Sequence, residues 1–150
     1  MIDYAVTVWG TAAAPSIKLR LHEGTSISNK AKQATYVDLG QDLLLVASLD
    51  DIGLYTNFIL YNCVASAPDS QYSMVLIDNH ECVNSDLYPE LIKSEGVAKS
   101  RGASVEKYVK FAAFRFASGD RVQFQCDVIP CTADYDCDDV VFGRCAMLNE

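Results

Sequence analysis

Alternation of apolar and polar residues along the chain predicts a succession of short β-strands. The clearest run is 121–128, whose two faces differ completely in polarity. One face carries Val122, Phe124, Cys126 and Val128, and the other carries Arg121, Gln123, Gln125 and Asp127. A period of two with one apolar face is typical of a half-buried strand. We therefore expect this run to cover a hydrophobic core, with a cysteine on its buried side.

The residues before this run predict its hairpin partner. Phe114 and Phe116 share a face, and the turn 118–120 (Ser-Gly-Asp) folds one run back on the next. Val109 and Phe111 are out of phase with that face, which predicts a β-bulge near Ala112 and Ala113. The expected hairpin core consists of Phe111, Phe114, Phe116, Val122 and Phe124.

Similar patterns recur along the rest of the chain, at 2–8, 17–22, 43–49, 55–64 and 72–77. The run 43–49 is apolar on both faces, which is typical of a central strand of a sandwich. From 83 to 106 alternation is lost, and Leu87, Leu91 and Ile92 suggest only a short helical turn in a surface connection. With roughly seven or eight strands and no long amphipathic helix, the pattern favours an all-β, immunoglobulin-like antiparallel β-sandwich.

The first strand has a special position. Ile2, Tyr4, Val6 and Val8 alternate with more polar residues, and the segment 11–16 that follows resembles a linker. A first strand with no earlier strand to pair with is expected to be an exposed edge, which seeks partners. The alternative is an ordinary first strand of the domain. We expect residues 1–15 to be a linker strand and 16–150 to be the domain itself.

Composition narrows the class of protein. The chain has 150 residues, of which 50% are hydrophobic, and a net charge of −8. This suits a single domain and argues against nucleic acid or anionic membrane surfaces as partners. No apolar run approaches the roughly 18 residues of a membrane helix. Because Met1 is followed by no basic leader region, we expect the chain to be an extracellular fragment of a larger secreted or membrane-anchored precursor.

The six cysteines favour disulfides and an oxidising compartment. They are Cys63, Cys82, Cys126, Cys131, Cys137 and Cys145. A zinc site is the rival interpretation, but no CxxC knuckle occurs, and His22 and His80 are far from the tail in sequence. Spacing alone does not choose among the 15 possible pairings of six cysteines.

Residue patterns for catalysis or metal binding are weak. The chain contains neither a G-x-S-x-G elbow nor a Gly-rich phosphate loop, so we expect no enzyme and no cofactor. Asp134, Asp136 and Asp138 resemble the opening of a calcium loop, but Asp139 occupies the glycine position, and we expect no metal. The locally basic stretch could bind an acidic protein ligand through the 83–106 loop, although a solvated connection is the simpler interpretation. Its cations are Lys93, Lys99, Arg101 and Lys107.

The order of these features resembles the C-terminal half of a zona pellucida (ZP) module, the ZP-C domain. The shared elements are YNCVAS, LIDNHEC, the F-x-F motif at 114–116 and VQFQCDVIPC, and the similarity covers about residues 16–145. ZP modules are extracellular and polymerise into filaments of egg coats, cuticles and other matrices, while some members act as co-receptors. The resemblance implies disulfides Cys63–Cys126, Cys82–Cys145 and Cys131–Cys137.

The resemblance also implies a role for the first strand. Residues 2–9 are similar to the internal hydrophobic patch of ZP linkers, which extends in filaments as a strand that a neighbouring subunit embraces. The expected function is a structural subunit that polymerises with other ZP-module subunits, through Ile2, Tyr4, Val6 and Val8. The alternative is an extracellular ligand-binding or co-receptor domain. The N-terminal ZP domain, basic cleavage site, external hydrophobic patch and anchor of the family are not found in this sequence, so we expect a fragment that resembles the mature form.

Overall fold

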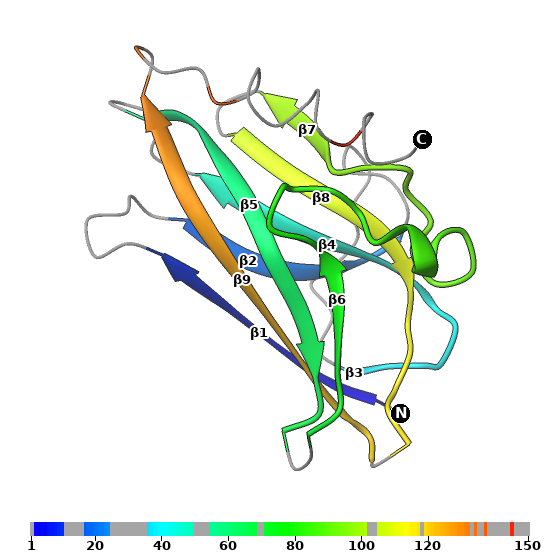
Figure 1. Cartoon of the computed structure of the whole chain (residues 1–150). Helices are drawn as coiled ribbons and strands as arrows, with labels where there is room; N and C mark the ends of the chain where they lie inside the picture. Colours follow the sequence, from blue (N-terminus) through cyan, green and yellow to red (C-terminus); the bar gives the residue numbers. More distant parts are fainter. Residues whose placement is uncertain are drawn as a thin grey trace.

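The structure is a sandwich of two β-sheets. The computed structural model describes residues 2–10, 17–24, 36–49, 55–68, 71–101, 105–117, 119–132, 134, 137 and 145, with the backbone alone for 2–10 and 101. One sheet has five strands in the order β3-β1-β9-β5-β6, and the other has four in the order β2-β4-β8-β7 (Figure 1). The predicted all-β, immunoglobulin-like sandwich is confirmed.

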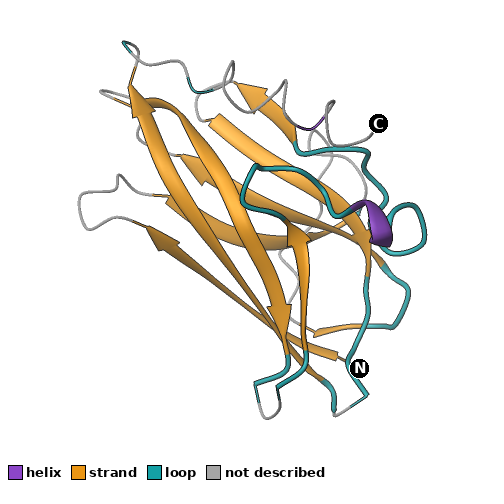
Figure 2. Cartoon of the chain, in the orientation of Figure 1, coloured by secondary structure: helices purple, strands orange, loops and turns teal. Residues whose placement is uncertain are grey.

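Strands form most of the described chain, and a short 3₁₀ turn interrupts them (Figure 2). Their bounds are β1 Ile2–Gly10, β2 Ile17–Glu23, β3 Tyr36–Val37, β4 Asp42–Leu49, β5 Tyr55–Ser66, β6 Ser73–Ile77, η1 Ser85–Leu87, β7 Ala98–Arg101, β8 Val105–Ala112 and β9 Arg121–Thr132. All of the strand pairs are antiparallel except β1 with β9, which is parallel.

The core lies between the two sheets and follows the alternation in the sequence. On β9 the residues Val122, Phe124 and Cys126 are buried, as their pattern predicts. β4 pairs with β2 on one side and β8 on the other. Every residue of 43–49 is buried, so the prediction of a central strand is confirmed. The turn 38–41 that leads into β4 places Gly40 at φ 84°, a conformation that glycine adopts without a Cβ clash.

The predicted hairpin is wrong, because β8 and β9 belong to different sheets. β8 pairs with β4 in unbroken register up to Ala112, where the strand ends. Ala113 is then paired with both Gly40 and Gln41 through two backbone hydrogen bonds of 2.8 Å. With Gly40 at φ 84°, this two-to-one pairing is a G1 bulge, so a bulge does form at Ala113, with its extra residue on the β4 side. The connection then crosses to the opposite sheet, where β9 begins.

The aromatic residues of this connection pack in the core between the two sheets. Phe111, Phe114 and Phe124 meet edge to face, with ring centroids 5.5–6.1 Å apart. Val122 is buried with them, and Phe116 is partly buried against the core. The expected core residues therefore do pack in one core, although their strands face each other across it instead of lying side by side.

The segment 83–106 has more structure than a surface connection. After η1, the carbonyl oxygen of Leu87 accepts hydrogen bonds from the backbone N–H groups of Leu91 and Ile92. Ile92 is 1% exposed and forms a bridge with Phe111. β7 then adds an edge strand beside β8. The helical turn in this segment is η1 at Ser85–Leu87, which reaches only the first of the three predicted anchors. The expectation that 83–106 contains no strand is wrong, because β7 lies within it.

Candidate functional site

The first strand is part of the sandwich. β1 forms eight residue pairs with β9, from Asp3 opposite Arg121 to Gly10 opposite Val128. It also pairs with β3 at Ile2 and Asp3. β1 is therefore paired with β9 from Asp3 to Gly10, which fits the alternative of an ordinary strand, but its other edge is paired with β3 only at Ile2 and Asp3. From Tyr4 onward, that edge has no partner strand among the described residues. Figure 1 shows β1 running beside β9, with its first residues beside β3.

In the ladder, three of the expected partner residues of β1 are paired with buried residues of β9. Tyr4, Val6 and Val8 are opposite Val122, Phe124 and Cys126, respectively. Those three residues of β9 are at most 1% exposed. Residues 2–10 contain no cysteine, so β1 is joined to the sandwich by its ladder and not by a disulfide. No disulfide joins β1 to its neighbours in the sheet, β3 and β9.

Three disulfides pair all six cysteines, and the pairs are those that the family resemblance implies. Cys63 and Cys126 join the neighbouring strands β5 and β9 and are fully buried. The bridge from Cys131 to Cys137 closes a loop directly after β9, with a sequence separation of 6 residues. Cys82–Cys145 brings the distal part of the tail back to the loop after β6.

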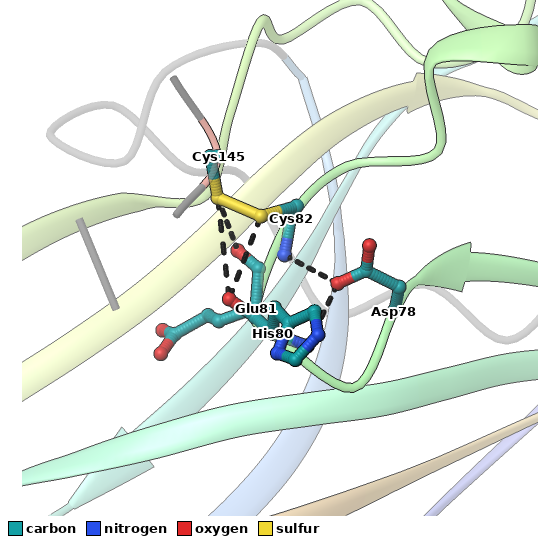
Figure 3. Close-up of a disulfide and its surroundings, with 5 residues drawn as sticks. All are labelled: Asp78, His80, Glu81, Cys82 and Cys145. Carbon is teal, nitrogen blue, oxygen red and sulfur yellow. Dashed lines mark hydrogen bonds between the residues drawn. A yellow bond between two sulfur atoms is a disulfide. The ribbon is translucent and has the colours of Figure 1, made fainter. Parts of the chain in front are cut away.

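The loop that carries Cys82 is organised by Asp78 (Figure 3). The Oδ1 atom of Asp78 accepts hydrogen bonds from the backbone N–H groups of His80, at 2.8 Å, and Cys82, at 3.0 Å. The backbone N–H of Asp78 donates to the carbonyl of Cys82 at 2.9 Å. These bonds close a tight turn in which Glu81 adopts a left-handed conformation, with φ 62°. Asp78 thus fixes the position of the Cys82 sulfur.

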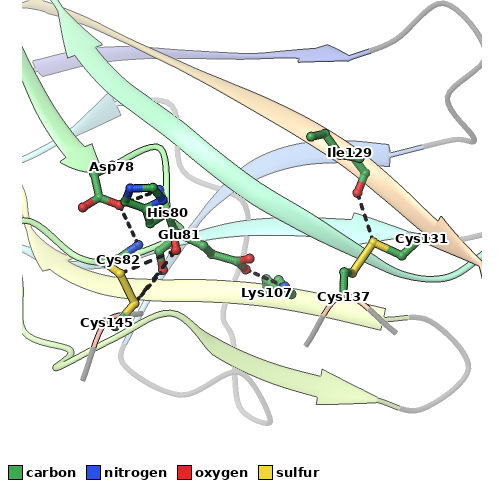
Figure 4. Close-up of polar contacts among 9 residues, drawn as sticks. All are labelled: Asp78, His80, Glu81, Cys82, Lys107, Ile129, Cys131, Cys137 and Cys145. Carbon is green, nitrogen blue, oxygen red and sulfur yellow. Dashed lines mark hydrogen bonds and ion pairs between the residues drawn. A yellow bond between two sulfur atoms is a disulfide. The ribbon is translucent and has the colours of Figure 1, made fainter. Parts of the chain in front are cut away.

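The same turn directs Glu81 into the sandwich, where it meets Lys107 of β8 (Figure 4). The Lys107 Nζ and Glu81 Oε1 atoms are 2.5 Å apart, and the two side chains are 6% and 4% exposed. The Nζ atom also lies 5.4 Å from the centroid of the Phe58 ring on β5. This ion pair links the loop that follows β6 of the five-stranded sheet to β8 of the four-stranded sheet.

Sequence reasoning missed this pair, although a signal was present. Lys107 falls in the buried phase of β8, between Val105 and Val109. A charged residue at such a position requires a buried partner of opposite charge. The predicted basic surface is correspondingly smaller. Lys93 and Lys99 are exposed, while the side chain of Arg101 lies outside the described residues.

The structure gives little support for a metal centre. Among the described residues, no group of three or more His, Cys, Asp or Glu side chains could hold a metal ion. Asp134 is described and exposed, whereas Asp136, Asp138 and Asp139 of the calcium-like run lie outside the described residues. In the described part of the chain, we find no helix with the length and apolar character needed to cross a bilayer.

Comparison with known protein families agrees with this architecture. The family model of the ZP-C domain matches residues 12–140, which is most of the chain. The chain belongs to the zona pellucida family, as a ZP-C domain. Searches of curated proteins and of solved structures gave no match. Members of the family are extracellular components of ZP modules, which generally polymerise with other ZP proteins and serve structural roles.

Proposed function

We propose that this chain is the C-terminal domain of a filament-forming ZP subunit and that β1 is the strand shared between subunits. In the filament, β1 of one subunit would lie on β9 of the next. The observation that carries the proposal is the parallel ladder of eight residue pairs between β1 and β9. It includes the buried residues Val122, Phe124 and Cys126 of β9. Membership of the chain in an extracellular structural family also supports the proposal.

Exchange of β1 is physically reasonable for two reasons. An identical strand from another copy would form the same ladder, so little interaction energy distinguishes the exchanged from the closed state. The strand also lacks cysteines, so its release breaks only non-covalent contacts. The exchange would therefore depend on concentration and on the length of the connection between β1 and β2.

Disulfide trapping tests this proposal directly. Asp3 and Arg121 are paired in the β1–β9 ladder, and Arg121 is exposed. We would prepare Asp3→Cys and Arg121→Cys as separate proteins, mix them under mild oxidation, and look for a covalent heterodimer on non-reducing gels. We expect a heterodimer whose yield rises with concentration. The control mixes Asp3→Cys with Lys99→Cys, whose cysteine lies on β7 of the other sheet, and should give only background dimer.

The double variant Asp3→Cys/Arg121→Cys provides the second control. It should form an intramolecular bond, which verifies that the register permits a disulfide at this pair. If the double variant closes within one chain while the mixed single variants stay monomeric at every concentration, strand sharing through β1 is refuted. Peptide mass spectrometry would verify that the native bridges are retained.

A ligand-binding role is the second candidate, and the observation that favours it is the exposure of Lys93 and Lys99 on an acidic chain. Only part of the basic stretch contributes, because Lys107 is engaged inside the sandwich. Pull-down of extracellular proteins with wild-type chain and with Lys93→Glu/Lys99→Glu would test it. Loss of a saturable partner on charge reversal supports recognition, and unchanged capture removes this candidate.

A further inference from the structure

The three disulfides differ in how well the protein covers them. Cys63, Cys126 and Cys137 are fully buried, and Cys131 is 3% exposed. Cys82 is 6% exposed, and Cys145 is only partly buried. Thiol–disulfide exchange requires an attacking thiolate to reach a sulfur atom, so access decides which bridge reacts first. Cys145 is the least buried of the six cysteines.

The two halves of this bridge are also held differently. Cys82 is fixed by hydrogen bonds of its backbone to Asp78. The Sγ atom of Cys145 lies 3.7 Å from the carbonyl oxygen of Glu81 and 4.0 Å from that of His80 (Figure 3). Because a disulfide sulfur has no hydrogen to donate, these are packing contacts. The sulfur of Cys145 thus rests on the turn, whereas Cys82 is part of it.

The bridge covers the segment that carries the buried ion pair. Cys145 packs on the peptide of Glu81, and the carboxylate of the same residue binds Lys107 in the interior (Figure 4). Opening the bridge removes the contact of Cys145 with the peptide of Glu81, and the turn then depends on the hydrogen bonds of Asp78 for its position. A local opening can therefore occur without unfolding of the two sheets, which Cys63–Cys126 continues to support.

We propose that Cys82–Cys145 is a thiol–disulfide exchange site for an extracellular dithiol, and that its opening exposes Lys107. A thiolate of the dithiol attacks Sγ of Cys145, which forms a mixed disulfide and releases Cys82 as a thiolate. The second thiol of the dithiol then displaces Cys145, so the dithiol becomes a disulfide and its two protons and two electrons pass to the two cysteines. This inference goes beyond strand sharing and does not depend on it.

Graded reduction of the native protein tests the site. The chain would be incubated with increasing dithiothreitol, trapped with iodoacetamide and digested for mass spectrometry. We expect Cys82 and Cys145 to be alkylated at concentrations that leave the other four cysteines oxidised and the β-sheet circular dichroism unchanged. Reduction of Cys131–Cys137 first, or of all bridges together with loss of structure, would overturn the proposal.

Lysine labelling tests the consequence of opening. Lys99 and Lys107 are opposite each other in the β7–β8 ladder, so Lys99 is an exposed internal reference. Acetylation of Lys107 relative to Lys99 should rise by about tenfold or more after selective reduction, because labelling of a buried group follows the population of its open form. Cys82→Ser/Cys145→Ser should reproduce the rise, and Cys131→Ser/Cys137→Ser should not. If Lys107 stays protected after Cys82–Cys145 is reduced in the wild-type chain, this bridge does not cover it.

Discussion

Lys99 and Lys107 are directly opposite each other in the ladder of β7 and β8, yet only Lys99 is exposed to solvent. Lys107 is inside the sandwich and forms its ion pair with Glu81. Like charges on opposite residues of a sheet repel each other. The carboxylate of Glu81 compensates the charge of Lys107 and connects the Cys82 loop to the second sheet. The same two lysines provide a matched pair of substitutions.

Lys107→Met should destabilise the fold by roughly 3–5 kcal/mol, because it leaves the carboxylate of Glu81 buried without its partner. Lys99→Met should change stability by less than about 0.5 kcal/mol, as is usual for exposed positions. Urea unfolding of the oxidised proteins, followed by circular dichroism, measures both. Equal effects of the two substitutions would show that the ion pair has no special role in stability.

The disulfides should differ in their contribution to stability. Cys63→Ala/Cys126→Ala removes a cross-link with a sequence separation of 63 residues, and Cys131→Ala/Cys137→Ala removes one with a separation of 6. Loop-closure entropy predicts losses of about 4 and about 2 kcal/mol, respectively. Both losses should be larger still, because all four cysteines are buried and removal of their sulfur atoms leaves cavities. A larger loss for the short loop in denaturant titrations would contradict this order.

Asp78→Ala should weaken the Cys82 loop, because the backbone N–H groups of His80 and Cys82 lose their common acceptor. We expect a loss of about 1–3 kcal/mol, in the range for hydrogen bonds to a charged group. Hydrogen exchange at the amides of residues 80 and 82 would report the effect locally. Asp78→Asn retains an acceptor oxygen and should be milder, and the exposed Asp86 provides a control as Asp86→Ala. Unaltered exchange in Asp78→Ala would show that the turn forms without this acceptor.

Phe124→Ala should cost roughly 3–5 kcal/mol, because it removes a fully buried ring and leaves a cavity between the sheets. Phe124 contacts Phe111 and Phe114 edge to face, so both rings lose a packing partner. Tyr72→Ala is the control, since Tyr72 stacks on Phe116 but is 53% exposed. Thermal unfolding should show a large fall in Tm for Phe124→Ala and a small one for Tyr72→Ala. Similar falls for both would argue against a core centred on this cluster.

The alternation of residues by itself determined which side chains are buried. Val122, Phe124 and Cys126 on β9 and the doubly apolar β4 were identified because burial of one or both faces leaves a local trace in the sequence. The cysteine count indicated an oxidised protein, and the order of the motifs led to the ZP-C family. The pairing of the cysteines came from that resemblance, since their spacing leaves many combinations open.

Only the tertiary structure decided which strands are neighbours. β8 and β9 cover the same core from opposite sheets, and their patterns are the same as those of a hairpin. Likewise, nothing local places β1 parallel to β9, or selects Lys107 as the partner of Glu81. The physical reason is that burial of a side chain is recorded in its own residue, whereas strand pairing and ion pairing depend on contacts between residues far apart in the chain.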